Sequence, residues 1–301
     1  MNAKEISESL ATAVERAAPA VVRVEGRRRP SSGIVWSADG HVVTAAHTLH
    51  HEEGVTVTLA DGRTLPAKVV GVDHGTDVAL LKVDAALSEA PRTSEKRRVG
   101  ELVVVLSRAG SGVRAGLGMV AAANGPWRTA SGGRIDRWIE VDGALPPGAS
   151  GGPLVDVEGA VVGMNTSALA RGGSTVPVET VERVVASLLA HGGVRRGWLG
   201  VAVQPVRLDE KQAGTAGQER ALLLVSVAAE SPATTAGLQV GDVVLGFAGQ
   251  AVADPRELHA RLDESTVDAP VAVRLLRGGV VTDVSVTVGG RVAGHPHGCG
   301  R

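Results

Sequence analysis

Residues 41–70 read HVVTAAHTLHHEEGVTVTLADGRTLPAKVV, and this stretch decides the fold class. It holds three short runs rich in β-branched residues, at 41–44, 55–59 and 68–70, and each run predicts a strand. Asp61-Gly62 separates the last two runs and indicates a hairpin, because Gly accepts the positive φ that tight turns need. Similar short runs recur outside this stretch, at 21–24, 79–83, 102–106, 119–122, 138–141 and 159–164. So many short strands with almost no helix between them predict a mainly β protein built from barrels or sandwiches.

Two helices interrupt this pattern. Apolar residues recur every four positions between Ile6 and Val14, which predicts a helix that Pro19 ends. A second apolar helical face follows Pro177, and the Gly192-Gly193 pair ends it. Beyond that pair, a unit of about a hundred residues mixes a helix at 255–262 with strands at 198–201, 221–227, 242–247, 271–276 and 283–288. We therefore predict a helical segment at 1–18, a first domain at 19–192, a second domain at 195–290 and a flexible tail at 291–301.

Composition and charge exclude several classes of protein. The formal net charge is −1, so no global field draws the chain to nucleic acid or to an anionic membrane. The basic triplets at 27–29 and 96–98 lack neighbouring aromatic residues for base stacking and are typical of solvated loops. The longest apolar stretch, 221–229, is far shorter than the roughly 18 residues of a membrane span. The first residues lack a secretory signal and the chain has one cysteine, so we expect a cytoplasmic protein without an intramolecular disulfide.

The segment Gly148-Ala149-Ser150-Gly151-Gly152-Pro153-Leu154 is the sharpest candidate for chemistry. A nucleophilic serine needs an exposed Oγ and backbone N–H groups that hold the negative oxygen formed when a carbonyl is attacked. Pro147-Gly148 suits the second and third positions of a type II turn, which would aim the amides of Gly148 and Ser150 at one point. Taken alone, the same string is as consistent with an ordinary loop.

Two further residues complete a candidate constellation. His47 follows Thr44-Ala45-Ala46 at the end of an apolar strand and supplies a possible base, and Asp77 precedes another apolar strand and supplies a possible orienting carboxylate. Each alone is more typical of a structural residue. The order His, Asp, Ser, with gaps of 30 and 73 residues, points to nucleophilic catalysis.

These segments resemble the three active-site motifs of chymotrypsin-like serine proteases, and residues 19–22 resemble their bacterial HtrA/Deg branch. Residues 196–201, followed by 231–233, 236–238 and 241–244, resemble the PDZ domain of that branch, so the resemblance covers roughly residues 10–290. It implies a two-barrel protease domain followed by a smaller α+β PDZ domain. It also implies an ATP-independent serine endopeptidase that needs no metal or organic cofactor and degrades unfolded or exposed polypeptides in protein quality control.

The sequence departs from the family at two positions. Members usually carry Asn where this chain has Ala149, and often another where it has Pro146. Because the oxyanion donors are backbone amides, Ala149 need not abolish activity, and we expect a competent site. The alternative is a catalytically inactive PDZ-containing protein that binds peptides or acts as a chaperone.

Substrate specificity is expected to follow from four residues. The resemblance places Ala144, six residues before Ser150, at the base of the primary pocket, and Asn165-Thr166-Ser167 at its wall. These residues offer no carboxylate that could pair with Arg or Lys. We therefore expect cleavage after small or medium aliphatic residues.

The second domain is expected to bind an apolar C-terminal peptide. By resemblance, Trp198-Leu199-Gly200-Val201 is the loop whose amides hold the carboxylate, and Leu258 and Leu262 line the opposite wall of the groove. The alternative places these leucines and Val201 in the core. His295, His297 and Cys299 alternate in the tail and could bind a soft metal, but a disordered end is the stronger interpretation.

The resemblance also implies a homotrimer and, as the alternative location, the periplasm or cell envelope. Family trimers commonly use aromatic contacts near the start of the protease domain. Here the first aromatic residue is Trp36, beyond the entry segment, so the trimer rests on the resemblance alone and a monomer is also compatible with the sequence.

Overall fold

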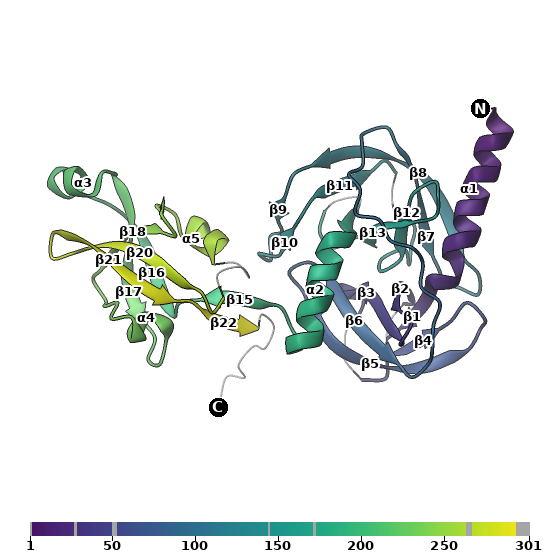
Figure 1. The fold of residues 1–301 in the computed structure, drawn as a ribbon, viewed down its shortest axis with the longest axis horizontal. Helices are drawn as coiled ribbons and strands as arrows, with labels where there is room; N and C mark the ends of the chain where they lie inside the picture. Colours follow the sequence, from purple (N-terminus) through teal and green to yellow (C-terminus); the bar gives the residue numbers. More distant parts are fainter. Residues whose placement is uncertain are drawn as a thin grey trace. The chain divides into compact units, whose positions relative to one another are not determined.

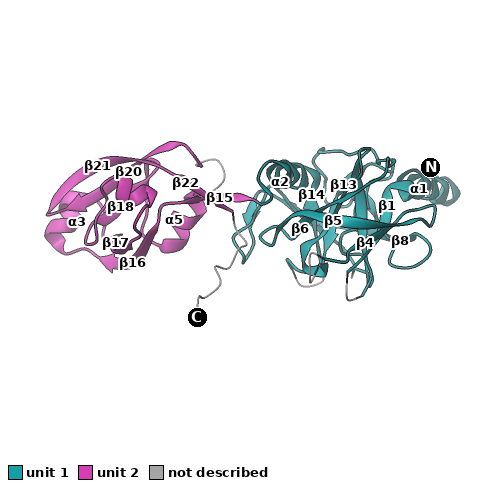
Figure 2. Cartoon of the chain, turned by 90° about the horizontal axis from the view of Figure 1, so that it is seen from below, with its two compact units in different colours: residues 1–193, 296–301 teal, residues 194–295 magenta. Residues whose placement is uncertain are grey.

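The computed structural model describes residues 2–26, 29–49, 53–143, 145–170, 173–262 and 267–292. The chain divides into two compact units, Met1–Gly193 and Val194–His295 (Figure 2). Ala144, His295, His297 and Cys299 lie outside the described residues.

The first unit begins with a closed barrel. Its strands are β1 (Val21–Glu25), β2 (Ser31–Ser37), β3 (His41–Ala45), β4 (Thr56–Thr58), β5 (Thr64–Asp73) and β6 (Val78–Val83), hydrogen-bonded in the order β1-β2-β3-β6-β5-β4. The predicted hairpin joins β4 to β5, and Gly62 adopts a φ of 89° in its turn. Every strand of the decisive stretch at 41–70 is therefore part of this barrel.

A second closed barrel follows. Its strands are β7 (Leu102–Ser107), β8 (Arg114–Asn124), β11 (Trp138–Val141), β12 (Pro153–Val155), β13 (Val161–Thr166) and β14 (Ser174–Pro177), in the order β11-β14-β13-β12-β7-β8, with a small hairpin of β9 (Trp127–Arg128) and β10 (Arg134–Ile135) beside them. An aliphatic cluster that includes Val103, Ile139, Leu154 and Ala149 fills its interior. The predicted mainly β, two-barrel fold is confirmed.

Two helices flank the barrels (Figure 1). Helix α1 (Ala3–Ala17) starts with a capping box between Asn2 and Glu5 and passes into the short turn η1 (Ala18–Ala20), which contains Pro19. Helix α2 (Val178–His191) contacts β5 and β6 of the first barrel and β13 and β14 of the second, so it joins the two barrels. No helix within the described ranges is both long enough and apolar enough to cross a bilayer.

The second unit is built on a six-stranded sheet. The strands of this sheet are β16 (Val201–Arg207), β17 (Arg220–Val227), β18 (Val243–Phe247), β19 (Gln250–Ala251), β20 (Pro270–Arg277) and β21 (Val280–Thr287). The helices of the unit are α3 (Glu210–Ala216), α4 (Pro232–Thr235) and α5 (Pro255–Arg261). A separate pair joins β15 (Arg195–Trp198) to β22 (Gly289–Val292). The chain's one phenylalanine, Phe247, is fully buried in an otherwise aliphatic core.

One predicted strand of this unit is wrong. The sequence predicts a continuous strand over 198–201, but β15 ends at Trp198 and β16 begins at Val201. Gly200 takes a φ of 81°, and the carbonyls of Leu199 and Gly200 accept the N–H groups of Ala233 and Ala228 at 2.9 and 2.8 Å. The backbone therefore turns here instead of extending.

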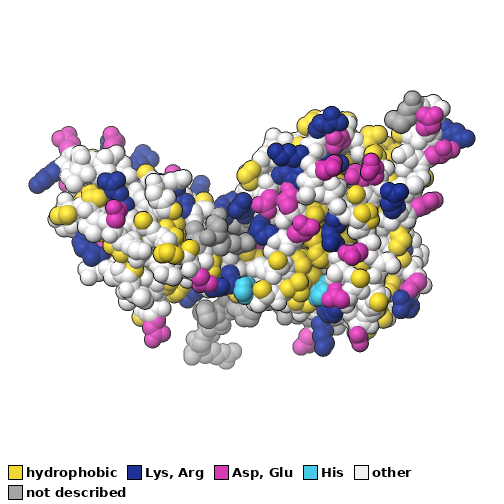
Figure 3. All heavy atoms as spheres, viewed as in Figure 1, with side chains coloured by type: hydrophobic (Ala, Val, Ile, Leu, Met, Phe, Trp, Pro, Cys, Tyr) yellow, Lys and Arg dark blue, Asp and Glu magenta, His cyan; other side chains and the backbone are white. Residues whose placement is uncertain are grey.

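Charge is mixed over the surface that Figure 3 shows. Basic and acidic side chains are interspersed on each unit, in keeping with a formal net charge of −1. That face carries no broad area of one sign that would attract a polyanion by its field.

Candidate active site

His47 and Asp77 form a hydrogen-bonded pair at one end of the first barrel. His47 lies in the turn η2 (Ala46–Thr48) directly after β3, and Asp77 directly precedes β6, the strand that pairs with β3. The His47 Nδ1 lies 2.8 Å from Asp77 Oδ2, and the His47 N–H donates to Asp77 Oδ1 at 2.8 Å. Asp77 is 3% exposed, so its carboxylate is committed to these partners. The arrangement fixes the imidazole ring through Nδ1, so Nε2 is the nitrogen that can act on a neighbour.

A tight turn places Asp77. The Asp73 carboxylate accepts the N–H groups of Gly75 and Thr76 at 3.1 and 3.0 Å and the Thr76 hydroxyl at 2.6 Å. Asp77 itself has a φ of 60°, a left-handed conformation that Asp tolerates better than most residues. Its carbonyl accepts the Ala46 N–H at 3.0 Å. Asp73 has no role in the sequence-based prediction, although an Asp that caps the following amides is a recognisable turn signal.

Ser150 follows the turn that the sequence predicts. The Ala149 N–H donates to the Pro146 carbonyl at 3.0 Å, and Gly148 has a φ of 81°, as a type II turn with Pro147 and Gly148 at its centre requires. A Cβ on Gly148 would lie 2.3 Å from the Cβ of Ala109, so no other residue fits this backbone.

The amides of Gly148 and Ser150 are available to a ligand. In the described part of the chain neither N–H has a hydrogen-bond acceptor, whereas Ala149, Gly151 and Gly152 donate theirs at 3.0, 2.8 and 2.9 Å. Ser150 is 9% exposed. Unpaired amides beside a buried serine are costly to the fold, and they are suited to hold a developing negative oxygen.

Thr166 and Ser167, at the end of β13, connect the two halves of the site. The Thr166 hydroxyl, which is fully buried, donates to Asp77 Oδ2. The Ser167 Oγ lies 3.1 Å from Ser150 Oγ and 3.4 Å from His47 Nε2, and the Ser167 N–H donates to Ser150 Oγ at 3.2 Å. Among the described residues there is no direct hydrogen bond between Ser150 Oγ and His47 Nε2. The Ser167 Oγ is therefore within hydrogen-bond distance of both groups.

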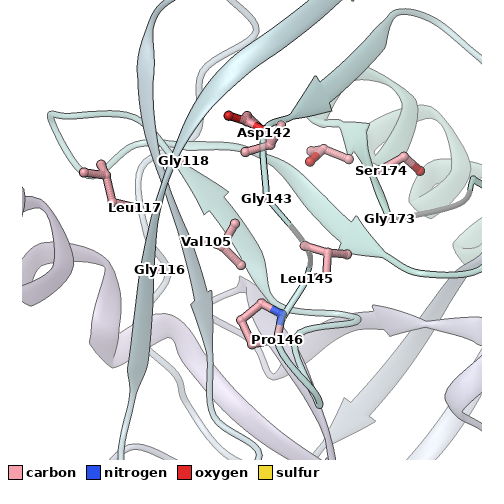
Figure 4. A pocket seen from close by; sticks show the side chains of 12 residues that line it. Val105, Gly116, Leu117, Gly118, Asp142, Gly143, Leu145, Pro146, Gly173 and Ser174 are labelled. Carbon is pink, nitrogen blue, oxygen red and sulfur yellow. The ribbon is translucent and has the colours of Figure 1, made fainter.

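A cavity of about 70 Å³ opens beside the Ser150 loop, in the second barrel. Figure 4 shows Val105, Leu145 and Pro146 around it, with Asp142 at the opposite edge and its carboxylate directed away from them. The remaining lining residues are Gly116, Leu117, Gly118, Val141, Gly143, Gly173, Ser174 and Thr175.

The residues assigned to the pocket wall from the sequence do not line this cavity. Asn165 is fully buried and accepts the Thr175 hydroxyl at 3.0 Å, and Thr166 and Ser167 face Asp77 and Ser150. Asp142 is among the residues that line the cavity, and it is exposed to solvent.

In the second unit, β16 is an edge strand of the sheet, because β17 is its one partner among the described strands, and it contacts α5. Leu199 and Leu258 are 3% and 2% exposed and belong to the core. Val201 and Leu262 are partly buried against that core. The ring of Trp198 is covered by the Arg291 guanidinium, 3.9 Å from its centroid. Of the residues predicted to bind the peptide, Val201 in the loop and Leu262 in the wall thus keep surface that a ligand could contact.

Comparison with known proteins extends over both units. A model of the trypsin-like peptidase domain matches residues 31–164, and a model of the PDZ domain matches residues 197–288. Two curated relatives are each named a probable periplasmic serine endoprotease DegP-like. The Brucella suis protein is 34% identical over 277 residues, which cover 87% of this chain and 53% of that protein. The Rhizobium meliloti protein is 36% identical over 282 residues, which cover 89% of this chain and 55% of that protein. A solved structure of the HtrA-type protease AlgW with a tripeptide has a TM-score of 0.71 and 30% identity, and the match covers 96% of this chain and 99% of that chain.

The chain spans about half the length of the curated relatives it matches. Those relatives are named as periplasmic, which contradicts the cytoplasmic location predicted from the first residues, and that prediction was wrong. A short address segment decides location, whereas the residues of the packed domains do not record it. Identity of 30% through both units, over nearly the full length of a solved HtrA-type protease, shows that this chain belongs to the HtrA family of trypsin-like serine proteases with a PDZ domain.

Proposed function

We propose that this chain is an ATP-independent serine endopeptidase that degrades unfolded or exposed polypeptides, with Ser150 as nucleophile, His47 as general base and Asp77 as orienting carboxylate. The observation that carries the proposal is the His47–Asp77 pair, held by two hydrogen bonds of 2.8 Å, next to a serine loop that presents two unpaired amides. A structural His–Asp pair would not require unpaired amides nearby.

In the proposed reaction, Ser150 Oγ attacks the carbonyl carbon of a peptide bond and its proton passes to His47 Nε2. The carbonyl oxygen becomes negative and is held by the N–H groups of Gly148 and Ser150. His47 then gives the proton to the departing amine as the C–N bond breaks, which leaves an acyl-enzyme. Water, deprotonated by His47, releases the acid product. Before the first step, the Ser150 hydroxyl must turn from Ser167 to His47, because its hydrogen-bond partner in the structure is the Ser167 Oγ at 3.1 Å.

We propose that the cavity beside the Ser150 loop accepts the residue preceding the cleaved bond. At about 10 to 15 Å³ for each water-sized group, its 70 Å³ hold about five to seven such groups, a size suited to Val, Ala or Leu. Val105 and Leu145 give it an apolar wall. Peptide mapping should find cleavage after these residues, and cleavage mainly after Lys or Arg would instead implicate Asp142.

The test of the activity compares wild type with Ser150→Ala. A fluorophosphonate probe should label the wild-type chain and not the variant, and only the wild type should digest a disordered protein without ATP. Both proteins should bind the same peptides, which checks that the variant is folded. Absence of labelling and digestion in the wild type would overturn the activity and favour an inactive peptide-binding protein.

For the second unit, residues 195–290, we propose binding of apolar C-terminal peptides as an added strand on β16, with the carboxylate at the turn of Leu199 and Gly200. The edge position of β16 and its contact with α5 support this proposal. HtrA-type AlgW has been solved with a tripeptide and with a decapeptide. Titration with a labelled apolar peptide should give saturable binding, which amidation of the peptide's C-terminus should weaken.

Location and assembly complete the proposal. The names of the relatives support a periplasmic protein, and fractionation of cells tests it. A homotrimer is our proposal for assembly, and the mass in solution tests it. We do not assign its contacts to Trp36, because this side chain is 7% exposed and lies under the Arg92 guanidinium, 4.4 Å from its ring centroid.

A further inference from the structure

Ser32, on β2 of the first barrel, reaches across to the Ser150 loop of the second. It is fully buried. Its N–H donates to the Ser150 carbonyl at 3.1 Å, and its hydroxyl donates to the Gly148 carbonyl at 2.6 Å. The same hydroxyl accepts the Arg108 N–H at 2.8 Å. We propose that Ser32 is a positioning residue that holds the two unpaired amides in place, an inference that rests on the proposed protease function.

The direction of these hydrogen bonds is fixed. An amide N–H such as that of Arg108 can only donate, and a carbonyl such as that of Gly148 can only accept, so a single group between them must both accept and donate. A hydroxyl does both. Because the site is buried, the Gly148 carbonyl would lose its partner if the hydroxyl were removed.

The link from Ser32 to the Gly148 amide runs through one peptide unit. The carbonyl of the unit between Gly148 and Ala149 is bound by Ser32, and its N–H is bound by the Pro146 carbonyl. With both ends of that unit held, only rotation about φ and ψ of Gly148 can redirect the Gly148 N–H. Glycine rotates freely there, and the short distance to Ala109 prevents a stiffer residue at this position.

The loop has no means of its own to replace this support. Pro146, Pro147, Gly148 and Ala149 carry no hydrogen-bonding side chain, and the Ala149 methyl is fully buried in the aliphatic cluster. Among the residues that the structure describes, Ser32 is the one whose side chain bonds the backbone of 146–149.

Ser32 is itself rigidly held. Its carbonyl accepts the Thr44 hydroxyl at 2.7 Å. The Arg108 side chain, 7% exposed, donates from Nε to the Val21 carbonyl at 2.6 Å and from Nη2 to the Ala18 carbonyl at 3.1 Å. Burial lowers the pKa of this guanidinium. Ser32 and Arg108 are thus both hydrogen-bonded to the first barrel or to the turn η1 that precedes it. The first barrel therefore sets the position of the Ser150 loop.

The test compares Ser32→Ala with Ser31→Ala. Ser31 is the neighbour in sequence, is 4% exposed, and bonds the Val24 carbonyl and the Thr48 hydroxyl instead of the Ser150 loop. Removing an oxyanion donor outright costs about 10²- to 10³-fold in kcat, so loosening one should cost about 10- to 100-fold. We expect this loss in kcat for Ser32→Ala with KM within about twofold of wild type, and little change for Ser31→Ala.

Two readouts separate positioning from a general loss of stability. A peptide boronate, whose tetrahedral adduct places an oxygen at the two amides, should lose affinity for Ser32→Ala in parallel with kcat. Ser32→Cys keeps a hydrogen-bonding group at this position but donates more weakly, so it should fall between wild type and Ser32→Ala. Equal kcat losses in Ser31→Ala and Ser32→Ala, or a loss confined to KM or to the melting temperature, would overturn the inference.

Amide hydrogen exchange of the peptide covering 146–152 keeps this inference separate from the proposed activity. Loss of one net hydrogen bond should speed exchange there by about fivefold in Ser32→Ala, without change in the second unit. If wild type neither labels nor digests, the proposed function fails, whereas unchanged exchange in Ser32→Ala would remove the positioning role by itself.

Discussion

The two halves of the candidate active site are held by different means. The His47–Asp77 half belongs to one barrel, where the β3–β6 ladder brings the two residues together and two hydrogen bonds of 2.8 Å join them. The Ser150 half is a loop of the other barrel, and its hydroxyl is engaged with Ser167 instead of His47. Pairs within one ladder are set by register, whereas geometry across the two barrels depends on a few long-range side-chain bonds.

The largest expected effect comes from breaking the first half. Asp77→Asn removes the charge beside His47 and disfavours the correct tautomer, so kcat should fall by about 10⁴-fold. Steady-state kinetics on a peptide substrate measures it. Asp136→Asn is the matched control, because Asp136 accepts a buried Thr180 hydroxyl at 2.9 Å outside the site. A loss below tenfold for Asp77→Asn would show that this half contributes little.

Thr166→Val tests the bond that links the halves. It preserves the side-chain shape but removes the hydroxyl that donates to Asp77 Oδ2. A buried charged acceptor that loses its partner costs about 1 to 3 kcal/mol or more, so we expect kcat to fall by about 10- to 100-fold. Thr180→Val removes an equally buried hydroxyl from Asp136 and should lower stability without this loss in kcat. Equal kcat for the two variants would contradict the link.

Ala149→Asn tests how the Ser150 loop is packed. The Ala149 methyl is fully buried among aliphatic side chains, so a buried amide there should reduce the free energy of unfolding of the first unit by about 1 to 3 kcal/mol. Thermal unfolding measures the change.

Ala248→Asn is the control for Ala149→Asn, and it should change the free energy of unfolding in the opposite direction. Ala248 and Gly249 have φ of 53° and 74° in an exposed hairpin turn, where Asn-Gly is favoured. Ala248→Asn should therefore raise the stability of the second unit slightly. A higher free energy of unfolding in Ala149→Asn would instead show that the loop offers hydrogen-bond partners to the Asn side-chain amide.

Ser167→Ala should have the smallest effect, and it should be a gain. Removing its hydroxyl frees Ser150 Oγ to turn to His47 and leaves only the Ser167 N–H as a competing donor. A net hydrogen bond is worth about 0.5 to 1.5 kcal/mol, so fluorophosphonate labelling should become about two- to tenfold faster. Slower labelling would mean that Ser167 passes the proton between the two residues.

The local pattern predicted much of this molecule. The β-branched runs and the Asp61-Gly62 turn predicted the barrel strands, and Pro147-Gly148 predicted the turn before Ser150. Trp198–Val201 is the exception, because it has the pattern of a strand but does not form one. Gly200 has a φ of 81°, and the carbonyls of Leu199 and Gly200 accept N–H groups from α4 and from the segment before it. A strand pattern records which residues favour extension, and it does not record which distant amides need an acceptor.

By itself the sequence determined the mainly β class, the order His47, Asp77, Ser150 and the limits within which each turn could form, because these depend on neighbours along the chain. Only the tertiary structure decided that Ser32 bonds Gly148, 116 residues away, and that Thr166 bonds Asp77, 89 residues away. Both hydroxyls donate to an oxygen, a carbonyl in one case and a carboxylate in the other, that is buried away from water. Such partners are chosen by which surfaces meet when two barrels close, and no spacing of residues in the chain carries that information.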